Sequence, residues 1–258
     1  MALKGTIGEL MVGPTCSVDF AFHRFQRQVD RVSDHPAWDC FLSAIERLEV
    51  SLKEAGGFDE QLQDVVDVQG GALLADSGTI DRYLETMDMS FALEDFAGAF
   101  VVTLQARLAA VDAAARNVYD AANQNALAVN GTCPQPGASS PVWHVANFTK
   151  HRDEWTEQLG KRESKTFAAL QDLGVAFMHQ TQRRYVPWVI GAAVRKIAEN
   201  ETLSLALRKI VADCERTCSA AGLTIQEHFA TLSAELDRIR RPLQATLGLV
   251  DDDASSGT

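Results

Sequence analysis

The stretch from Ser90 to Val129, SFALEDFAGAFVVTLQARLAAVDAAARNVYDAANQNALAV, decides the fold class of this chain. It is rich in alanine, the residue with the highest helix propensity, and Gly98 is its only glycine. Asn130 and Gly131 follow it directly and supply the end signal that helices favour. The sequence therefore predicts one long helix, which we expect to be the spine of the molecule.

Helix signals recur on both sides of this spine, and strand alternation is scarce. Ser17 is a predicted cap for a helix over 18–32, and Asp34 with Pro36 begins a second helix that stops at Gly56. Further helices are predicted over 59–74, from 79, and over 141–160, 166–173, 187–199, 201–221 and 224–241, with stops at Gly174, Gly222 and Pro242. The predicted fold class is all-α, a single bundle of about eight to ten helices around one long central helix.

Composition favours a soluble protein. The 258 residues include 46% hydrophobic side chains, and 24 basic against 35 acidic groups give a formal charge of −11. The longest apolar runs, 96–104 and 186–194, are half as long as a membrane span requires, and residues 1–18 lack the features of a secretory signal. We therefore expect a cytoplasmic protein without membrane contact, and the odd number of cysteines favours reduced thiols.

The acidic side chains concentrate in the first half of the chain. Residues 1–130 carry 9 basic and 20 acidic groups, whereas residues 131–258 carry 15 of each. The stretch TCPQPGASS at 132–140 has the composition of a linker and coincides with this change. We predict an acidic helical half (1–130), a loop (131–140), a second helical half (141–250) and a disordered tail (251–258), which together form one compact domain.

The densest group of functional side chains lies in WHVANFTKHRDEW, at 143–155 of the predicted helix 141–160. Its candidate site residues are His144, Asn147, Lys150, His151 and Arg152. In one interpretation His151 is an acid, a base or a ligand, Asn147 orients it, and Lys150 or Arg152 meets an anion. In the alternative interpretation the helix is half-buried, its two tryptophans anchor the core, and the histidines and Asn147 bond to nearby backbone.

Two smaller groups have two interpretations each. Arg183 and Arg184 adjoin Tyr185 and Trp188, and this combination suits a phosphate or a stacked base, although a solvated loop explains it as well. Cys214 and Cys218 suggest redox chemistry by their proximity, but they continue an apolar helical stripe and are better explained as core residues.

The stretch NFTKHRDEW at 147–155, with TFAALQDLGV at 166–175, resembles a helical segment of uncharacterised bacterial proteins, some of which are similar to HEPN-type helical domains. The resemblance covers about thirty residues. It implies an RNA-directed role for His151, in the setting of bacterial defence or toxin–antitoxin systems. None of the six histidines follows an arginine at the spacing of the family's nuclease motif, so whether the chain is an enzyme stays open.

Metal and cofactor sites are not expected. The chain has no Glu-x-x-His unit of the kind that di-iron bundles use, and His144 and His151 lie about 10 Å apart along a helix axis. The phosphate-loop, dinucleotide, elbow-serine and zincin motifs are also absent from the sequence.

Two functional hypotheses follow. The first is a HEPN-like protein that binds RNA or another phosphate ligand through the candidate site residues, with salt-sensitive affinity. The second is a non-enzymatic interaction, adaptor or immunity protein whose acidic half binds a basic protein partner. The alanine-rich spine also suits self-association, so we expect that the chain can form a homo-oligomer.

Overall fold

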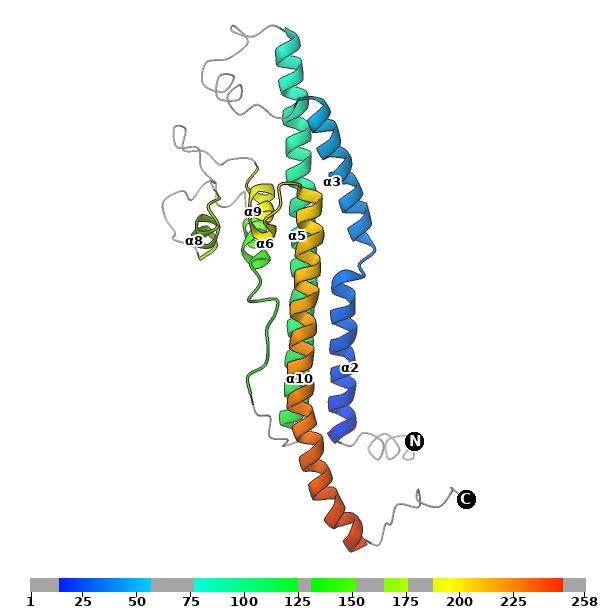
Figure 1. Cartoon of the computed structure of the whole chain (residues 1–258). Coiled ribbons are helices and arrows are strands. Elements are labelled where there is room, and N and C mark those ends of the chain that lie inside the picture. Colours follow the sequence, from blue (N-terminus) through cyan, green and yellow to red (C-terminus); the bar gives the residue numbers. More distant parts are fainter. Residues whose placement is uncertain (1–13, 57–76, 125–130, 152–164, 176–187, 248–258) are drawn as a thin grey trace, which may run out of the picture.

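The computed structural model describes residues 14–56, 77–124, 131–151, 165–175 and 188–247, and within these ranges it contains helices and no strand (Figure 1). The helices are α2 (Pro14–Ser33), α3 (Ala37–Glu54), α5 (Ser77–Gln124), α6 (Val142–Lys150), α8 (Lys165–Asp172), α9 (Val189–Ala198) and α10 (Leu203–Leu247). The all-α class and the one long helix are confirmed, whereas the described residues do not confirm a count of eight to ten. The predicted helix 59–74 and the predicted disordered tail 251–258 lie outside the described residues.

The spine is longer than the sequence predicts. Helix α5 runs unbroken for 48 residues, so the prediction of a separate short helix before Ser90 is wrong. The Ser90 hydroxyl donates to the Thr86 carbonyl oxygen at 2.9 Å, one turn earlier, and therefore stays inside the helix instead of capping it. The buried side chains of this helix include Phe100 and Leu104, both fully shielded from solvent.

Helix α10 also continues where the sequence predicts two stops. Thr224 does not cap a new helix, because its hydroxyl donates to the Ala220 carbonyl oxygen at 3.2 Å within the same helix. Gly222 lies against α2, where a Cβ atom would stand 3.3 Å from a ring carbon of Phe25. The missing side chain therefore serves helix packing at this position. The helix also passes Pro242, the predicted end, and reaches Leu247.

The break between α2 and α3 lies close to its predicted position, although α2 begins at Pro14, before the predicted cap Ser17. The Trp38 indole N–H donates to the Val32 carbonyl oxygen at 2.8 Å, and His35 Nδ1 accepts the Ala37 backbone N–H at 3.1 Å. Burial, with a contribution from Arg107, lowers the pKa of His35 and so favours the neutral ring that can accept this bond. The two helices are thereby held end to end.

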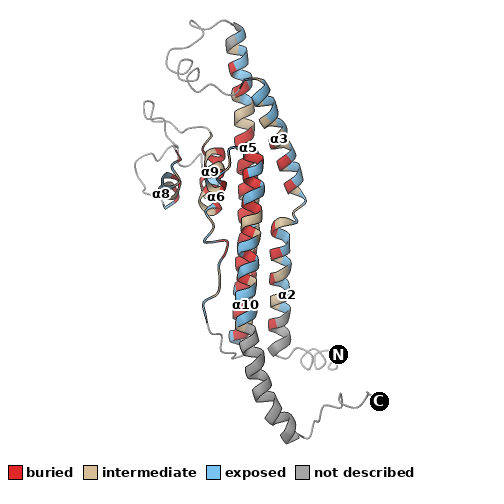
Figure 2. Cartoon of the chain, in the orientation of Figure 1, coloured by how far each residue is buried: buried red, intermediate tan, exposed pale blue. Residues whose placement is uncertain are grey.

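The molecule is elongated (Figure 1). Helices α2 and α3 contact both α5 and α10, and these four helices run along one long axis. Helices α6 and α9 contact α5 from the side, and α8 contacts α6. Buried residues from both halves of the sequence belong to a single hydrophobic cluster, which lies mainly along α5 and α10 (Figure 2).

Candidate functional site

Helix α6 carries the first of the candidate site residues and ends earlier than predicted. Pro141 stands at its N-cap, and Val145 and Phe148 bury the face that meets the core. The predicted helix reaches residue 160, but α6 ends at Lys150, and His151 is its C-cap with φ −116°. His151 is exposed and has left the helical backbone, so the helical spacing that the sequence predicts does not place its side chain.

Gln105 of α5 brings two of the candidate residues together. Its side-chain N–H donates to Asn147 Oδ1 at 3.2 Å, and its side-chain oxygen accepts a hydrogen bond from the Lys150 ammonium. Gln105 itself is 3% exposed, although it lies in the middle of the apolar spine. A buried amide needs polar partners, and α6 supplies two of them. The bonds fix the position of α6 on α5, and the sequence offers no signal for them because Gln105 lies 42 residues before Asn147.

The backbone N–H of His151 donates to the Asn147 carbonyl oxygen at 3.2 Å, as the C-cap of α6. His144 is half-buried, and its Nδ1 atom is shielded from solvent without a hydrogen-bond partner among the described residues. Arg152, Arg183 and Arg184 lie outside the described residues. The roles assigned to His151 and Asn147 therefore stay predictions.

Glu94 is a buried carboxylate that the sequence analysis does not single out. It is 3% exposed on α5, and its two oxygens accept the backbone N–H groups of Ile190 and Gly191, each at 2.9 Å. These donors belong to the first turn of α9, whose free N–H groups and positive dipole end favour a carboxylate. A Cβ atom on Gly191 would stand 3.0 Å from the Glu94 oxygen, so the glycine permits the close approach.

Asp112 lies 18 residues further along α5, and its carboxylate also accepts two backbone N–H groups. It is 4% exposed, and its oxygens accept the backbone N–H groups of Gly137 at 2.8 Å and Ala138 at 2.9 Å. These residues form the turn in the segment 131–140, which contains neither helix nor strand. A Cβ atom on Gly137 would lie 2.8 Å from Asp112 and from the Leu108 carbonyl oxygen. The loop is therefore bound tightly to the spine.

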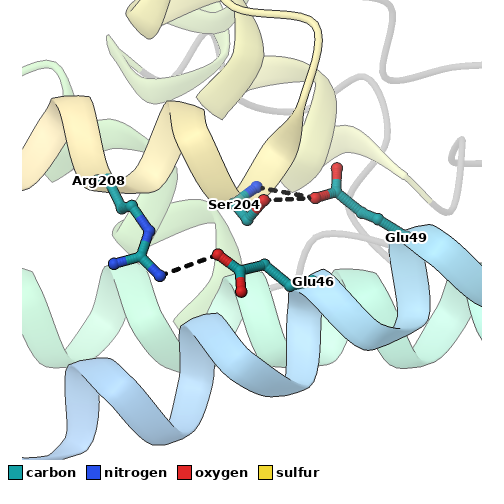
Figure 3. A network of polar contacts seen from close by, with 4 residues as sticks. All are labelled: Glu46, Glu49, Ser204 and Arg208. Atoms are coloured by element: carbon teal, nitrogen blue, oxygen red, sulfur yellow. Dashed lines mark hydrogen bonds and ion pairs between the residues drawn. The ribbon is translucent and has the colours of Figure 1, made fainter.

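Glu49 of α3 is the third carboxylate that accepts backbone N–H groups (Figure 3). Its carboxylate accepts the backbone N–H groups of Leu203 at 2.5 Å and Ser204 at 3.1 Å, and the Ser204 hydroxyl at 2.7 Å. It thereby caps the first turn of α10. One turn away, Glu46 pairs with Arg208 at 2.9 Å, a half-exposed contact of small energetic weight.

The two cysteines of α10 are core residues, as the sequence predicts. Cys214 and Cys218 are buried, and burial raises the pKa of Cys214 to about 11 and that of Cys218 to about 12. Protonated thiols are poor nucleophiles and poor metal ligands. Cys40, Cys133, Cys214 and Cys218 are free thiols.

Two general properties bear on the chemistry of the molecule. Over the described ranges, no group of three or more His, Cys, Asp or Glu residues could hold a metal ion. By length and composition one described helix, over 80–124, could cross a membrane, but half of its most apolar window is buried within the molecule. The core helix of a soluble protein meets the same criterion, so this feature is only weak evidence for a membrane span. The cytoplasmic location stays a prediction.

The sequence was compared with known protein families, with curated proteins and with solved structures, and no significant match was found. The described contacts do not test the HEPN resemblance either. The carboxylates of Glu94 and Asp112, together with Gln105, make the buried polar contacts that hold α9, the loop at 137–138 and α6 on the spine.

Proposed function

We propose that this protein is a non-enzymatic helical interaction protein, and that it binds a basic partner through the outer face of the first half of α5. The observation that carries the proposal is the composition of this outer face. Asp81, Glu85, Asp88 and Asp95 are all exposed there, beside exposed Leu84 and Phe96. We refer to these six residues as the acidic strip.

The acidic strip lies opposite the buried side of α5. At 100° per residue, its six members fall within an arc of about 120°, which faces away from buried Leu93 and Ala97. Arg82 is the only Lys or Arg between residues 78 and 99. Carboxylates interleaved with apolar side chains suit a partner helix that combines lysine or arginine with an apolar face.

The contacts of Asn147 and Lys150 give these two candidate site residues a structural role, and the proposal does not rest on them. Lys150 and Asn147 bond to Gln105, so in this arrangement they hold helices together. Glu94 and Asp112, the buried carboxylates of α5, bond to backbone N–H groups in the same way. Their hydrogen bonds give them a structural role.

A binding experiment with a defined probe tests the proposal. The probe is a fluorescent synthetic peptide of leucine and lysine that forms an amphipathic helix, and its anisotropy is titrated with the protein at about 50 mM and about 300 mM NaCl. The test variant removes the four charges of the acidic strip, as Asp81→Asn, Glu85→Gln, Asp88→Asn and Asp95→Asn. The control variant removes four exposed charges elsewhere, as Asp39→Asn, Asp120→Asn, Asp172→Asn and Glu201→Gln.

We expect the test variant to bind at least about tenfold more weakly than wild type, and the control variant to bind within about twofold of wild type. Equal weakening of both variants would mean that net charge alone attracts the peptide, and the proposal would be wrong. A labelled single-stranded RNA serves as the second probe. Salt-sensitive retention of RNA without retention of the peptide would favour the RNA-directed hypothesis instead.

A further inference from the structure

A cavity of about 230 Å³ lies where the loop 131–140, the start of α6, the end of α9 and the first half of α10 meet. Each of these four segments contributes an apolar residue to its lining, namely Pro136, Val142, Ile197 and Ile210. An apolar cavity of roughly 150 Å³ in another protein is large enough to hold benzene. The space beside α10 therefore has room for one ring of that size with a short side chain.

The loop that forms one wall of the cavity is fixed by the spine. Asp112 of α5 accepts the backbone N–H groups of Gly137 and Ala138. These two residues lie directly between Pro136 and Ser139, which line the cavity. Pro136 is itself buried. A wall that is already in place loses little conformational freedom when a ligand binds, so the cavity is suited to a small molecule.

The polar groups around the cavity are hydrogen-bond acceptors. The Ser139 hydroxyl donates its proton to the Gln135 carbonyl oxygen at 3.2 Å. The Thr217 hydroxyl donates to the Asp213 carbonyl oxygen at 2.9 Å. The backbone N–H groups of Ser139 and Ser140 also donate within the loop. Because a hydroxyl oxygen that donates its proton can still accept a hydrogen bond, a ligand of this cavity must supply the donors.

Asp213 is the only charged side chain among the described residues that line the cavity. Arg216 donates to one of its oxygens, but the Arg216 side chain is 72% exposed, and such a surface pair contributes little energy. Burial, together with the nearby Asp213 charge, raises the pKa of Cys214 to about 11, so this lining thiol stays neutral. The charge of the cavity is therefore negative and favours a cationic ligand.

We propose that this cavity binds a small apolar molecule that carries one ammonium group. An ammonium has three donors and no acceptor, which complements a lining that offers a carboxylate and hydroxyl oxygens. The apolar part of the molecule fills the space beside Ile197 and Ile210, and the ammonium pairs with Asp213. The acidic strip contributes no residue to this cavity, so the site is separate from the surface assigned to a basic partner.

Ligand-observed NMR titration of the full chain tests the proposal. The probes are benzylamine and cyclohexylmethylamine, which are protonated at about pH 7, and benzyl alcohol, which has nearly the same shape as benzylamine but no charge. In about 150 mM NaCl we expect both amines to bind wild type with a Kd below about 1 mM. Benzyl alcohol should bind at least about tenfold more weakly.

Three variants locate the site. Asp213→Asn removes the charge at almost unchanged shape, and it should weaken both amines at least about tenfold while leaving benzyl alcohol unchanged. The matched control is Glu215→Gln, an acid of the same helix that does not line the cavity, and it should bind the amines within about twofold of wild type. Thr217→Phe fills the cavity from an exposed position and should abolish the binding of all three probes.

Circular dichroism should show the same helix content for the three variants and wild type. Failure of both amines to bind wild type would overturn the proposal, as would equal binding of benzyl alcohol. Equal weakening by Asp213→Asn and Glu215→Gln would overturn it too, because overall negative charge would then attract the amines. Unchanged binding in Thr217→Phe would place the amines elsewhere on the molecule, with the same consequence.

Discussion

Glu94 and Asp95 are neighbours in the sequence with opposite surroundings in the structure. Glu94 is buried and caps α9, whereas Asp95, about 100° further round the helix, is exposed. In Glu94→Gln the amide group would set its own N–H donors against one of the two backbone N–H groups, Ile190 or Gly191. A buried donor without an acceptor costs about 1 to 3 kcal/mol, and we expect the free energy of unfolding to fall by this amount.

Urea denaturation followed by circular dichroism measures this change. Asp95→Asn is the matched control, because it removes the adjacent exposed charge, and its effect should stay within about 0.5 kcal/mol. If the free energy of unfolding fell equally in both variants, the bonds from Glu94 to α9 would not contribute significantly to stability.

The cysteines give a prediction about chemical reactivity. Thiolates react with alkylating reagents, so raised pKa values and burial should both protect Cys214 and Cys218. In native protein treated with iodoacetamide near pH 8, mass spectrometry should find exposed Cys40 labelled first and the α10 pair labelled only after unfolding. Early labelling of Cys214 in the native state would contradict the burial.

Alkaline pH should destabilise the fold through the same two thiols. Their pKa values are raised in the folded state, so the protonated form stabilises the fold below about pH 9, and this contribution is lost as the pH rises through about 11 and about 12. Between about pH 9 and about pH 12, the double variant Cys214→Ala, Cys218→Ala should lose less stability than wild type does. An identical pH profile in thermal melts would count against the prediction.

Replacement of His151, unlike that of Glu94, should leave the stability of the fold almost unchanged. His151 is exposed, and α6 ends before it, so His151→Ala should change the free energy of unfolding by no more than about 0.5 kcal/mol. A loss of about 2 kcal/mol or more in urea titrations would mean that the imidazole is a buried, satisfied group, contrary to its place in the structure.

At the scale of single helices, the unbroken courses of α5 and α10 can be tested by hydrogen exchange. Peptides that span Ser90 and Gly222 should exchange as slowly as the helix segments on either side, because the backbone hydrogen bonds continue through both sites. A zone of rapid exchange at 221–224 would instead indicate two helices with a hinge, as the sequence alone predicts.

The ends of the helices show what the sequence can and cannot predict. Pro36 and Gly56 fix the ends of α3, and Gly174 with φ +70° follows α8, because these signals act through the local backbone. Gly222 carries the same signal but is overruled by packing, since Phe25 fills the space beside it. Local propensities are weak against tertiary contacts, and for this reason the predicted stops within α10 are wrong.

The candidate site is less predictable for the same reason. Its polar contacts join residues far apart in the chain, such as Gln105 with Asn147 and Glu49 with Ser204. Side-chain type and helical spacing select Asn147 and Lys150, but they do not identify the buried partner on α5. A single buried glutamine in an alanine-rich helix looks like an ordinary surface residue in the sequence.

At the scale of the whole molecule, the shape gives a direct prediction for scattering in solution. Helix α5 alone spans roughly 72 Å at 1.5 Å per residue, and α10 extends beyond it. A compact protein of 258 residues would have a radius of gyration of about 18 Å. Small-angle X-ray scattering should give a clearly larger radius and a maximum dimension above about 70 Å. A value near that of a compact sphere would contradict the parallel course of α5 and α10.

The carboxylates that grip backbone N–H groups have one more consequence, which concerns how the molecule tolerates sequence change. Every residue except proline carries a backbone N–H, so the segments held by Glu94 and Asp112 can change most of their side chains without losing their anchors. The acids themselves, and the glycines at 137 and 191 that let them approach, have no such freedom. Helix α9 and the loop before α6 can therefore diverge in surface chemistry while their attachment to the spine stays the same.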